Sequence, residues 1–165
     1  MPLITTRPLV EIYTDGSCWP NPGPGGWAAM LLHQEYRKTI SGGCTHTTNN
    51  RMEMMAAIQA LSTLKLPCAV NLYSDSRYLV DGLHSWRVKR INHVGIRHRP
   101  DILNQDLWIE LIAASERHQI QWQWVRGHGK NQGNNEVDKI AGEERKRFTQ
   151  LLPGDGKVSV GYSHA

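Results

Sequence analysis

The spacing of apolar and polar positions predicts alternating strands and helices along the chain. Short apolar runs rich in β-branched and aromatic residues are typical of strands, and apolar residues three or four positions apart are typical of helices. Strands are expected at 9–14, 27–33, 36–41, 69–74 and 120–125, and helices at 50–64, 76–86, 104–118 and 135–148. Because an initial meander precedes the alternating strands and helices, the pattern indicates an α/β fold around one mixed sheet.

Three segments lack this periodicity. Residues 19–26 are dense in Gly and Pro, and we expect them to form a loop that is part of neither a helix nor a central strand. Residues 127–133 predict a flexible loop between the last strand and the last helix. Residues 149–165 are expected to form a loosely structured C-terminal tail after a single domain that spans residues 8–148.

Composition narrows the class of protein. A chain of 165 residues with 39% hydrophobic and 21% charged residues is ordinary for one soluble globular domain. It contains no run of about 18 apolar residues that would span a membrane, and residues 1–8 do not resemble a signal peptide. Three scattered cysteines are too few for a disulfide framework. We therefore expect a cytoplasmic protein that does not associate with membranes.

The formal net charge of +4 is concentrated in one segment, residues 82–100, which contains no Asp or Glu. The segment contains Trp86 and five basic residues, Arg87, Lys89, Arg90, Arg97 and Arg99. Basic residues interleaved with an aromatic ring are typical of a surface that contacts phosphate groups. The alternative is a solvated polar surface without a ligand.

Two predicted strands end in the same way, with Asp15 and with Asp75, each followed by small polar residues. Ligands of α/β sheets bind beyond the carboxyl ends of the strands. If these strands are parallel neighbours, about 4.8 Å apart, the two carboxylates lie side by side and need a shared proton or a cation. Alternatively, each Asp stabilises only the turn that follows its strand.

Two further acids lie in predicted helices. Glu53 shares a helix face with the alanines of 56–60, whose small side chains permit close approach to a sheet. Asn50 and Glu53 could instead form a helix-capping pair. Asp138 lies early in the last predicted helix, where stabilisation of the helix dipole is the alternative explanation.

His128 stands between two glycines in the loop that precedes the last helix. The glycines leave the imidazole room to move, which suits a proton shuttle near neutral pH. A surface histidine without a role is the alternative.

Several short segments together resemble bacterial type 1 ribonuclease H. They are Thr14–Ser17, Pro22–Gly26, Thr47–Glu53, Ser74–Ser76, Trp124–His128 and the later Asp138, in the order and spacing of that family over about residues 8–148. The resemblance implies a five-stranded mixed sheet flanked by helices. It also implies hydrolysis of the RNA strand of RNA–DNA hybrids, leaving 5′-phosphate and 3′-hydroxyl ends.

The resemblance also implies roles for individual residues. Asp15, Glu53, Asp75 and Asp138 match the metal-binding carboxylates of the family, and His128 matches its loop histidine. The residues expected to bind substrate are Gly16, Ser17, Cys18, Asn21, Thr48, Asn49, Asn50, Arg77, Trp86, Arg87, Lys89, Arg90 and Asn134. The implied cofactor is Mg²⁺, two ions per site, with Mn²⁺ as an alternative. The implied partner is an RNA–DNA hybrid, bound by a monomer that needs no protein partner.

The chain departs from the family pattern at a few positions. Trp86 is the only tryptophan of the basic segment, and Arg90 stands where an aromatic residue is expected. Arg77 stands where Gln is common, and the loop after His128 lacks a second histidine. Two other functions are alternatives. A DNA-cleaving nuclease of the same fold is disfavoured by the small size, and a hybrid-binding module without catalysis is disfavoured by the four acids.

Replacing Arg87, Lys89 and Arg90 with Ala should weaken hybrid binding and leave the chemical step intact. Each phosphate contact that is lost should lower the slope of log K against log salt by roughly 0.7–0.9, so we expect a decrease of about two to three units. KM should rise while kcat stays nearly constant, which a series of KCl concentrations will measure. An unchanged slope would identify the segment as a solvated surface.

Overall fold

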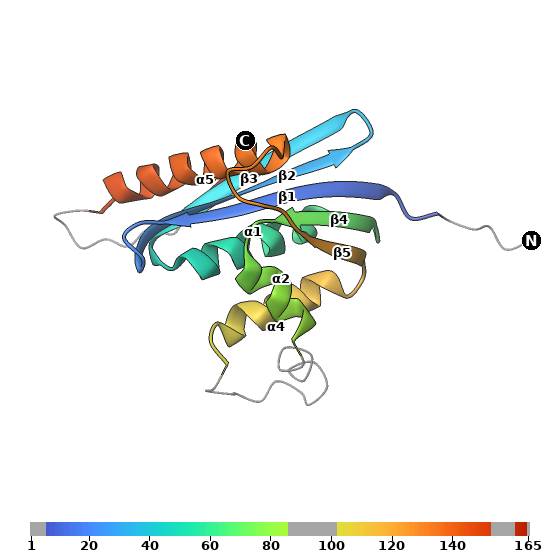
Figure 1. Cartoon of the computed structure of the whole chain (residues 1–165), viewed down its shortest axis with the longest axis horizontal. Helices are drawn as coiled ribbons and strands as arrows, with labels where there is room; N and C mark the ends of the chain where they lie inside the picture. The colour runs from blue at the N-terminus through green and yellow to red at the C-terminus, as the bar shows by residue number, and fades with distance from the viewer. Residues whose placement is uncertain (1–5, 86–101, 153–160, 165) are drawn as a thin grey trace, which may run out of the picture.

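The computed structural model describes residues 6–85, 102–152 and 161–164 (Figure 1). Its strands are β1 (Leu9–Cys18), β2 (Gly23–His33), β3 (Tyr36–Thr47), β4 (Ala69–Ser74), β5 (Gln119–Trp124) and β6 (Gly161–His164). Its helices are α1 (Asn49–Thr63), α2 (Arg77–His84), α4 (Gln105–Ser115) and α5 (Gln132–Gln150). Most of the basic segment, with Trp86, Arg87, Lys89 and Arg90, lies outside the described residues.

The described strands form one mixed sheet in the order β5-β4-β1-β2-β3-β6. Strands β1, β4 and β5 are parallel, and β2, β3 and β6 add to them by antiparallel pairing. Helices α1, α2 and α4 lie on one side of the sheet and α5 lies on the other (Figure 1). The predicted α/β fold, with a five-stranded mixed sheet flanked by helices, is confirmed, and β6 extends that sheet at its edge.

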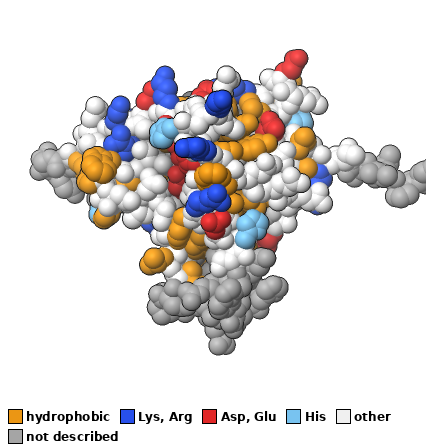
Figure 2. Space-filling model, viewed as in Figure 1, with side chains coloured by type: hydrophobic (Ala, Val, Ile, Leu, Met, Phe, Trp, Pro, Cys, Tyr) orange, Lys and Arg blue, Asp and Glu red, His pale blue; other side chains and the backbone are white. Residues whose placement is uncertain are grey.

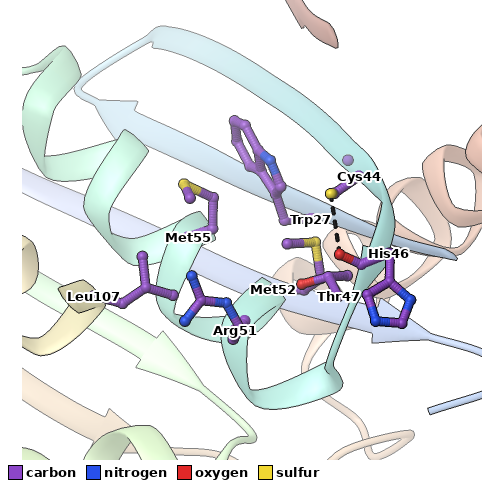
Figure 3. Close-up of a pocket in the computed structure, with 9 residues that line it drawn as sticks. Trp27, Cys44, His46, Thr47, Arg51, Met52, Met55 and Leu107 are labelled. Atoms are coloured by element: carbon purple, nitrogen blue, oxygen red, sulfur yellow. Dashed lines mark hydrogen bonds between the residues drawn. The ribbon is translucent and has the colours of Figure 1, made fainter. Parts of the chain in front are cut away.

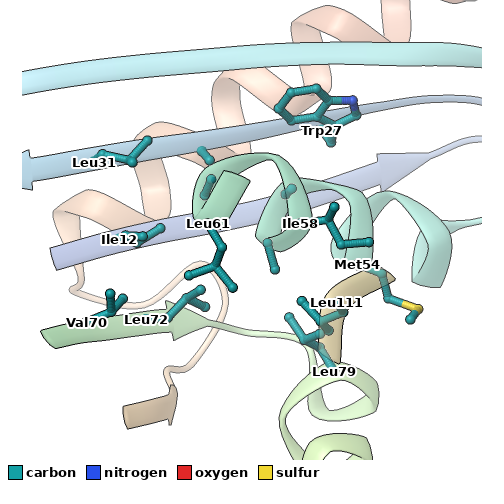
Figure 4. Packing of buried hydrophobic residues seen from close by; sticks show 14 of the residues in the cluster. Ile12, Trp27, Leu31, Met54, Ile58, Leu61, Val70, Leu72, Leu79 and Leu111 are labelled. Carbon is teal, nitrogen blue, oxygen red and sulfur yellow. The ribbon is translucent and has the colours of Figure 1, made fainter. Parts of the chain in front are cut away.

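The main hydrophobic core lies between α1 and the parallel strands (Figure 4). Leu61 of α1, Ile12 of β1 and Leu72 of β4 are fully buried there. The alanines at positions 56, 57 and 60 are also fully buried, as their predicted position on the sheet-facing side of the helix requires. Their small side chains let the backbone of α1 lie close to β1, which decides where the polar residues at the start of this helix come to lie.

The expectation that residues 19–26 join no central strand is wrong, because β2 begins at Gly23 and pairs with β1 and β3. A Cβ at Gly26 would lie 2.4 Å from the carbonyl oxygen of Ala141, so glycine lets α5 pack directly on the strand. The register shifts between Gly23 and Gly25, an irregularity of the kind that admits Pro24 to a strand. Packing of α5 on Gly26 stabilises this segment as a strand, and such a contact with a distant part of the chain cannot be predicted from local composition.

The C-terminal tail is also more regular than expected. Helix α5 continues to Gln150, and residues 161–164 form β6, which pairs with Ile40–Gly43 of β3. An edge strand such as β3 presents free backbone N–H and C=O groups that an extended segment can satisfy without any side-chain pattern. Among the described residues, no helix is long and apolar enough to cross a membrane.

His118 connects α4 to the sheet just before β5 begins. It is buried, and its Nδ1 accepts a hydrogen bond from the backbone N–H of Cys68, 3.1 Å away. Burial lowers the pKa of His118 below its ordinary value, and the positive charge of Arg117 lowers it further. The folded protein therefore keeps this imidazole neutral at a pH where an unfolded chain would protonate it.

Acidification should consequently destabilise the fold through His118. The contribution of neutral His118 to the free energy of unfolding is complete above pH 6.5, the pKa of histidine in the unfolded chain. It is lost as pH falls through the lower pKa of His118 in the folded state. His118→Asn offers an amide oxygen as the acceptor for the Cys68 N–H in place of Nδ1 and removes the titrating group. Urea unfolding of both proteins between about pH 5 and 8 should show a free-energy difference that changes with pH. If the unfolding free energies of the two proteins changed with pH in parallel, His118 would not be the source of the pH dependence.

Candidate active site

Three carboxylates from separate elements converge near the ends of the parallel strands. Asp15 lies in β1, Asp75 directly follows β4, and Glu53 lies in α1. One oxygen from each carboxylate lies within 4.8 Å of the others. The parallel register aligns Tyr13 with Tyr73, so Asp15 and Asp75 stand two residues further along their chains, at the same level. The structure thus brings together three of the four acids singled out from the sequence.

Close approach of α1 to β1 places Glu53 in this group. A Cβ at Gly16 would lie 2.4 Å from the backbone nitrogen of Glu53, so only glycine lets the helix lie this close to the strand. Thr48 caps α1, because its hydroxyl oxygen accepts a hydrogen bond from the Arg51 N–H at 3.3 Å. The alternative of a capping pair between Asn50 and Glu53 is therefore wrong, and the Glu53 carboxylate turns to the two aspartates.

Burial and mutual repulsion make this cluster difficult to ionise. Burial, and next the negative charge of Asp75, raise the pKa of Asp15 from 3.8 to about 8. Burial, and next the charge of Asp15, raise the pKa of Glu53 well above its ordinary value. The three groups are therefore all ionised only when a cation compensates their charge, and without a cation at least one of them keeps a proton.

The donor atoms of the cluster fit a hard divalent cation. All three side chains offer carboxylate oxygens, the ligands that Mg²⁺ prefers. Glu53 Oε2 is buried and has no hydrogen-bond partner among the described residues. A buried polar atom normally has a partner, and a cation held by Asp15, Glu53 and Asp75 would supply one.

The fourth acid, Asp138, lies at the margin of the cluster. It contributes to the raised pKa of Asp15, after burial and Asp75. It stands beyond the first turn of α5, where helix-dipole stabilisation is small, so that alternative does not explain its position. His128 Nδ1 lies 3.5 Å from Asp138 Oδ2, and the His128 side chain is 83% exposed. An imidazole in solvent beside one of the acids is placed where it can exchange protons.

Several residues expected to bind substrate lie around the start of α1. Asn21, in the turn between β1 and β2, accepts a hydrogen bond at its Oδ1 from the backbone N–H of Asn49, 3.2 Å away. Asn21 and Asn50 are exposed, and Thr48 and Asn49 are half-buried. Hydrogen bonding between the β1–β2 turn and α1 thus gathers these side chains on one surface.

Two of the expected substrate residues are buried. Asn134 has no exposed surface, because the first turn of α5 faces the sheet, and its side chain has no hydrogen-bond partner within the described part of the chain. The Cys18 thiol lies among the backbone carbonyls of Pro20, Gly23 and Thr47. Neither side chain is presented to a ligand on the surface, so the expected contact of Cys18 with substrate has to come from its backbone.

A separate hollow of about 150 Å³ lies beside the start of α1 (Figure 3). Its lining comes from β2, β3, α1 and α4 and comprises Trp27, Gly43, Cys44, His46, Thr47, Arg51, Met52, Met55 and Leu107. The Arg51 guanidinium forms a bidentate pair with Asp106 at 2.9 and 2.7 Å. None of the four acids lines this hollow, so it is distinct from the carboxylate cluster.

The contact between Trp124 and Asp75 is not predicted by the hydrophobic pattern of the sequence. The alternation in residues 120–125 predicts that Trp124 lies on the buried side of its strand, but its side chain is 39% exposed. Its indole N–H donates a hydrogen bond to the backbone carbonyl of Asp75, 2.9 Å away. Trp124 is part of the family-like segment Trp124–His128, which is the only sequence signal for this contact.

Comparison with known proteins gives a consistent result. The family model described as RNase H matches residues 7–146. The chain is 48% identical over 147 residues to a ribonuclease H of Thermoanaerobacter sp. (strain X514), covering 88% of this chain and 95% of that protein. It is 52% identical over 137 residues to a ribonuclease H of Symbiobacterium thermophilum, covering 80% of this chain and 91% of that protein.

Solved structures share the fold. The crystal structure of LC9-RNase H1, a type 1 RNase H with the type 2 active-site motif, has a TM-score of 0.77 at 26% identity and covers 96% of this chain and 78% of that one. LC11-RNase H1, solved in complex with an RNA/DNA hybrid, has a TM-score of 0.59 at 19% identity and covers 84% of this chain and 97% of that one.

Asp15→Asn should stabilise the metal-free protein, most strongly near pH 8. Because the folded pKa is raised, the ionised Asp15 destabilises the fold progressively as pH rises from 3.8 to about 8. Thermal unfolding in EDTA should show a higher Tm for the variant, by about 2–4 °C for each kcal/mol of relieved repulsion. Added Mg²⁺ should raise the Tm of the unsubstituted protein more than that of the variant. The control is Glu143→Gln, an exposed acid of α5, and an equal effect of both substitutions would contradict the prediction.

Proposed function

This chain belongs to the ribonuclease H family, whose members cleave RNA in RNA–DNA hybrids, and from that premise we propose that it hydrolyses the RNA strand with two divalent metal ions. The products are 5′-phosphate and 3′-hydroxyl ends. The observation that carries the proposal is the convergence of Asp15, Glu53 and Asp75 within 4.8 Å. Asp138 completes the set of acids, and Mg²⁺ is the cation that their oxygen atoms suit best.

The acids of the chain prepare the site for phosphodiester chemistry. When bound, Mg²⁺ neutralises charge on the attacking and leaving oxygens and lowers the pKa of bound water. Asp15 and Glu53, whose pKa values are raised by burial, release their shared proton when a cation compensates their charge. The carboxylates thus hold the cations at one position beside the surface that carries Asn21 and Asn49.

His128 acts as a proton carrier at this site. Its Nδ1 faces Asp138 at 3.5 Å while most of the ring remains in solvent. Its backbone has a φ of 52°, a left-handed conformation that directs the chain out of β5 and towards α5. From this position the imidazole exchanges protons between the site and bulk water and assists departure of the 3′-oxygen.

Recognition of RNA takes place through the backbone of Gly16–Cys18 and the asparagines beside it. The 2′-hydroxyl is the group that distinguishes RNA from DNA at such a site. Gly16 lies against Glu53, so a ribose read by this backbone stands next to the carboxylates. Thr48 and the basic segment 82–100 bind phosphates of the DNA strand.

The enzyme acts as a monomer in the cytoplasm. The acids and the surrounding polar residues all come from one chain, so the site needs no second subunit. Cys18, Cys44 and Cys68 are free thiols, which is typical of proteins in a reducing compartment.

A duplex with a short ribonucleotide run inside one DNA strand tests the proposal directly. Cleavage should require Mg²⁺ and fall only within the ribonucleotide run, because the site reads the 2′-hydroxyl. Asp75→Asn should abolish cleavage and leave hybrid binding intact, since it removes a ligand charge and not a phosphate contact. Glu143→Gln serves as the control. Cutting in the flanking deoxynucleotides would favour a DNA nuclease of the same fold.

His128→Ala should lower kcat by about 10²-fold, within the range for loss of a general acid or base, with little change in KM. Steady-state kinetics on the same hybrid measure both constants. The partial loss reflects a role in proton transfer that water can replace slowly. If the variant were as inactive as Asp75→Asn, His128 would be an obligatory ligand or base.

A further inference from the structure

Trp124 contacts two residues at the edge of the carboxylate cluster. Its indole Nε1–H donates a hydrogen bond to the backbone carbonyl of Asp75 at 2.9 Å. The guanidinium carbon of Arg77 lies over the same indole, 3.8 Å from the ring centroid. One side chain therefore joins the backbone of a candidate metal ligand to an exposed cation.

The hydrogen bond from Trp124 to Asp75 lies just beyond the end of the pairing between β4 and β5. The pairing of β4 with β5 reaches Ser74 and Trp124, and the Val125 N–H donates to the Ser74 carbonyl at 3.0 Å. Asp75 stands one residue beyond this ladder, so its carbonyl relies on a side chain for a partner. On the opposite side, a Cβ at Gly127 would lie 2.5 Å from Asp75 Oδ2, so the loop after β5 packs against the carboxylate itself. Asp75 is thus held at its backbone and at its side chain by the segment 124–127.

Stacking on the indole also fixes the direction of Arg77. An arginine that stacks on an aromatic ring keeps the N–H groups along its edge free for hydrogen bonds. Asp81 Oδ1 lies 4.0 Å from Arg77 Nη1, and both side chains are mostly exposed, so this pair holds the guanidinium only weakly. Figure 2 shows Lys and Arg side chains beside Asp and Glu side chains near the centre of this face of the molecule.

We propose that Trp124 is a positioning residue with two separable effects. Its indole N–H fixes the backbone of Asp75, and its ring holds the Arg77 guanidinium where it binds a phosphate of the hybrid. The inference rests on the proposed function, because it assigns Asp75 to cation binding and the neighbouring surface to the hybrid. The two effects use different parts of one side chain, so different substitutions separate them.

Three variants separate the two effects. Trp124→Phe keeps an aromatic face for Arg77 and removes the N–H, so Mg²⁺ affinity should fall by about 10-fold, as for loss of a hydrogen bond that orients a ligand. Arg77→Gln should keep the Mg²⁺ affinity and lower the salt slope of hybrid binding by roughly 0.7–0.9, the contribution of one phosphate. Trp124→Leu should show both defects.

Both readouts are independent of cleavage. Calorimetric titration with Mg²⁺ measures cation affinity, and hybrid binding in EDTA over a series of KCl concentrations measures the salt slope. Lys146→Gln, an exposed cation of α5, is the control for a general loss of positive charge. Circular dichroism and Tm establish that each variant is folded, and Trp124→Phe should restore the slope that Trp124→Leu loses.

Two results would overturn the inference. If Trp124→Phe binds Mg²⁺ as the unsubstituted protein does, the indole N–H does not position Asp75. If folded Trp124→Leu keeps the full salt slope, the ring does not position Arg77. Failure of the unsubstituted protein to cleave a hybrid would contradict the proposed function alone, because these titrations involve no cleavage.

Discussion

Repulsion among Asp15, Glu53 and Asp75 is the constraint on which the rest of the site depends. Carboxylates this close cannot all be ionised without compensation, and burial of Asp15 and Glu53 adds to the difficulty. The packing of α1 against β1 and β4 opposes that repulsion, because the fully buried Ile12, Leu61 and Leu72 lie in the same interface. The molecule thus uses hydrophobic burial to hold together a set of carboxylates that would otherwise separate.

Each acid reaches the cluster through backbone geometry. The parallel register of β1 and β4 sets the level of Asp15 and Asp75, and the missing side chain of Gly16 sets the distance of Glu53. Asp138 belongs to α5 and His128 to the loop before it. Helix α5 lies on the face of the sheet opposite α1 (Figure 1). The site is therefore rigid where three acids come from paired or packed elements and more open where the histidine enters.

Much of this could be predicted from the sequence, since periodicity reports which face of an element is buried. It located the strands, the helix that carries Glu53 and the equivalent positions of Asp15 and Asp75. The prediction that a strand ends at Asp15 is wrong, because β1 continues to Cys18 by pairing with β2. Periodicity gave wrong predictions where contacts with a neighbouring element determine the local structure. Gly23–Gly26 joins β2, where α5 packs on Gly26. The Trp124 side chain is partly exposed, and its indole N–H donates to the Asp75 carbonyl. Asn134 resembles a binding residue in sequence but faces the sheet, which only the position of α5 determines.

The pairing of β6 with β3 gives the two edges of the sheet different exposure to other molecules. Along Ile40–Gly43 the backbone groups of β3 already have partners within the chain. These residues of β3 offer no free backbone partner to a strand of another molecule, and the edge of the sheet passes to β6, which has only four residues. At the opposite edge, β5 is short, with polar side chains at Gln119, Gln121 and Gln123. Both edges of the described sheet are therefore short strands, a feature that disfavours pairing with the sheet of another molecule and is separate from the stability of the core.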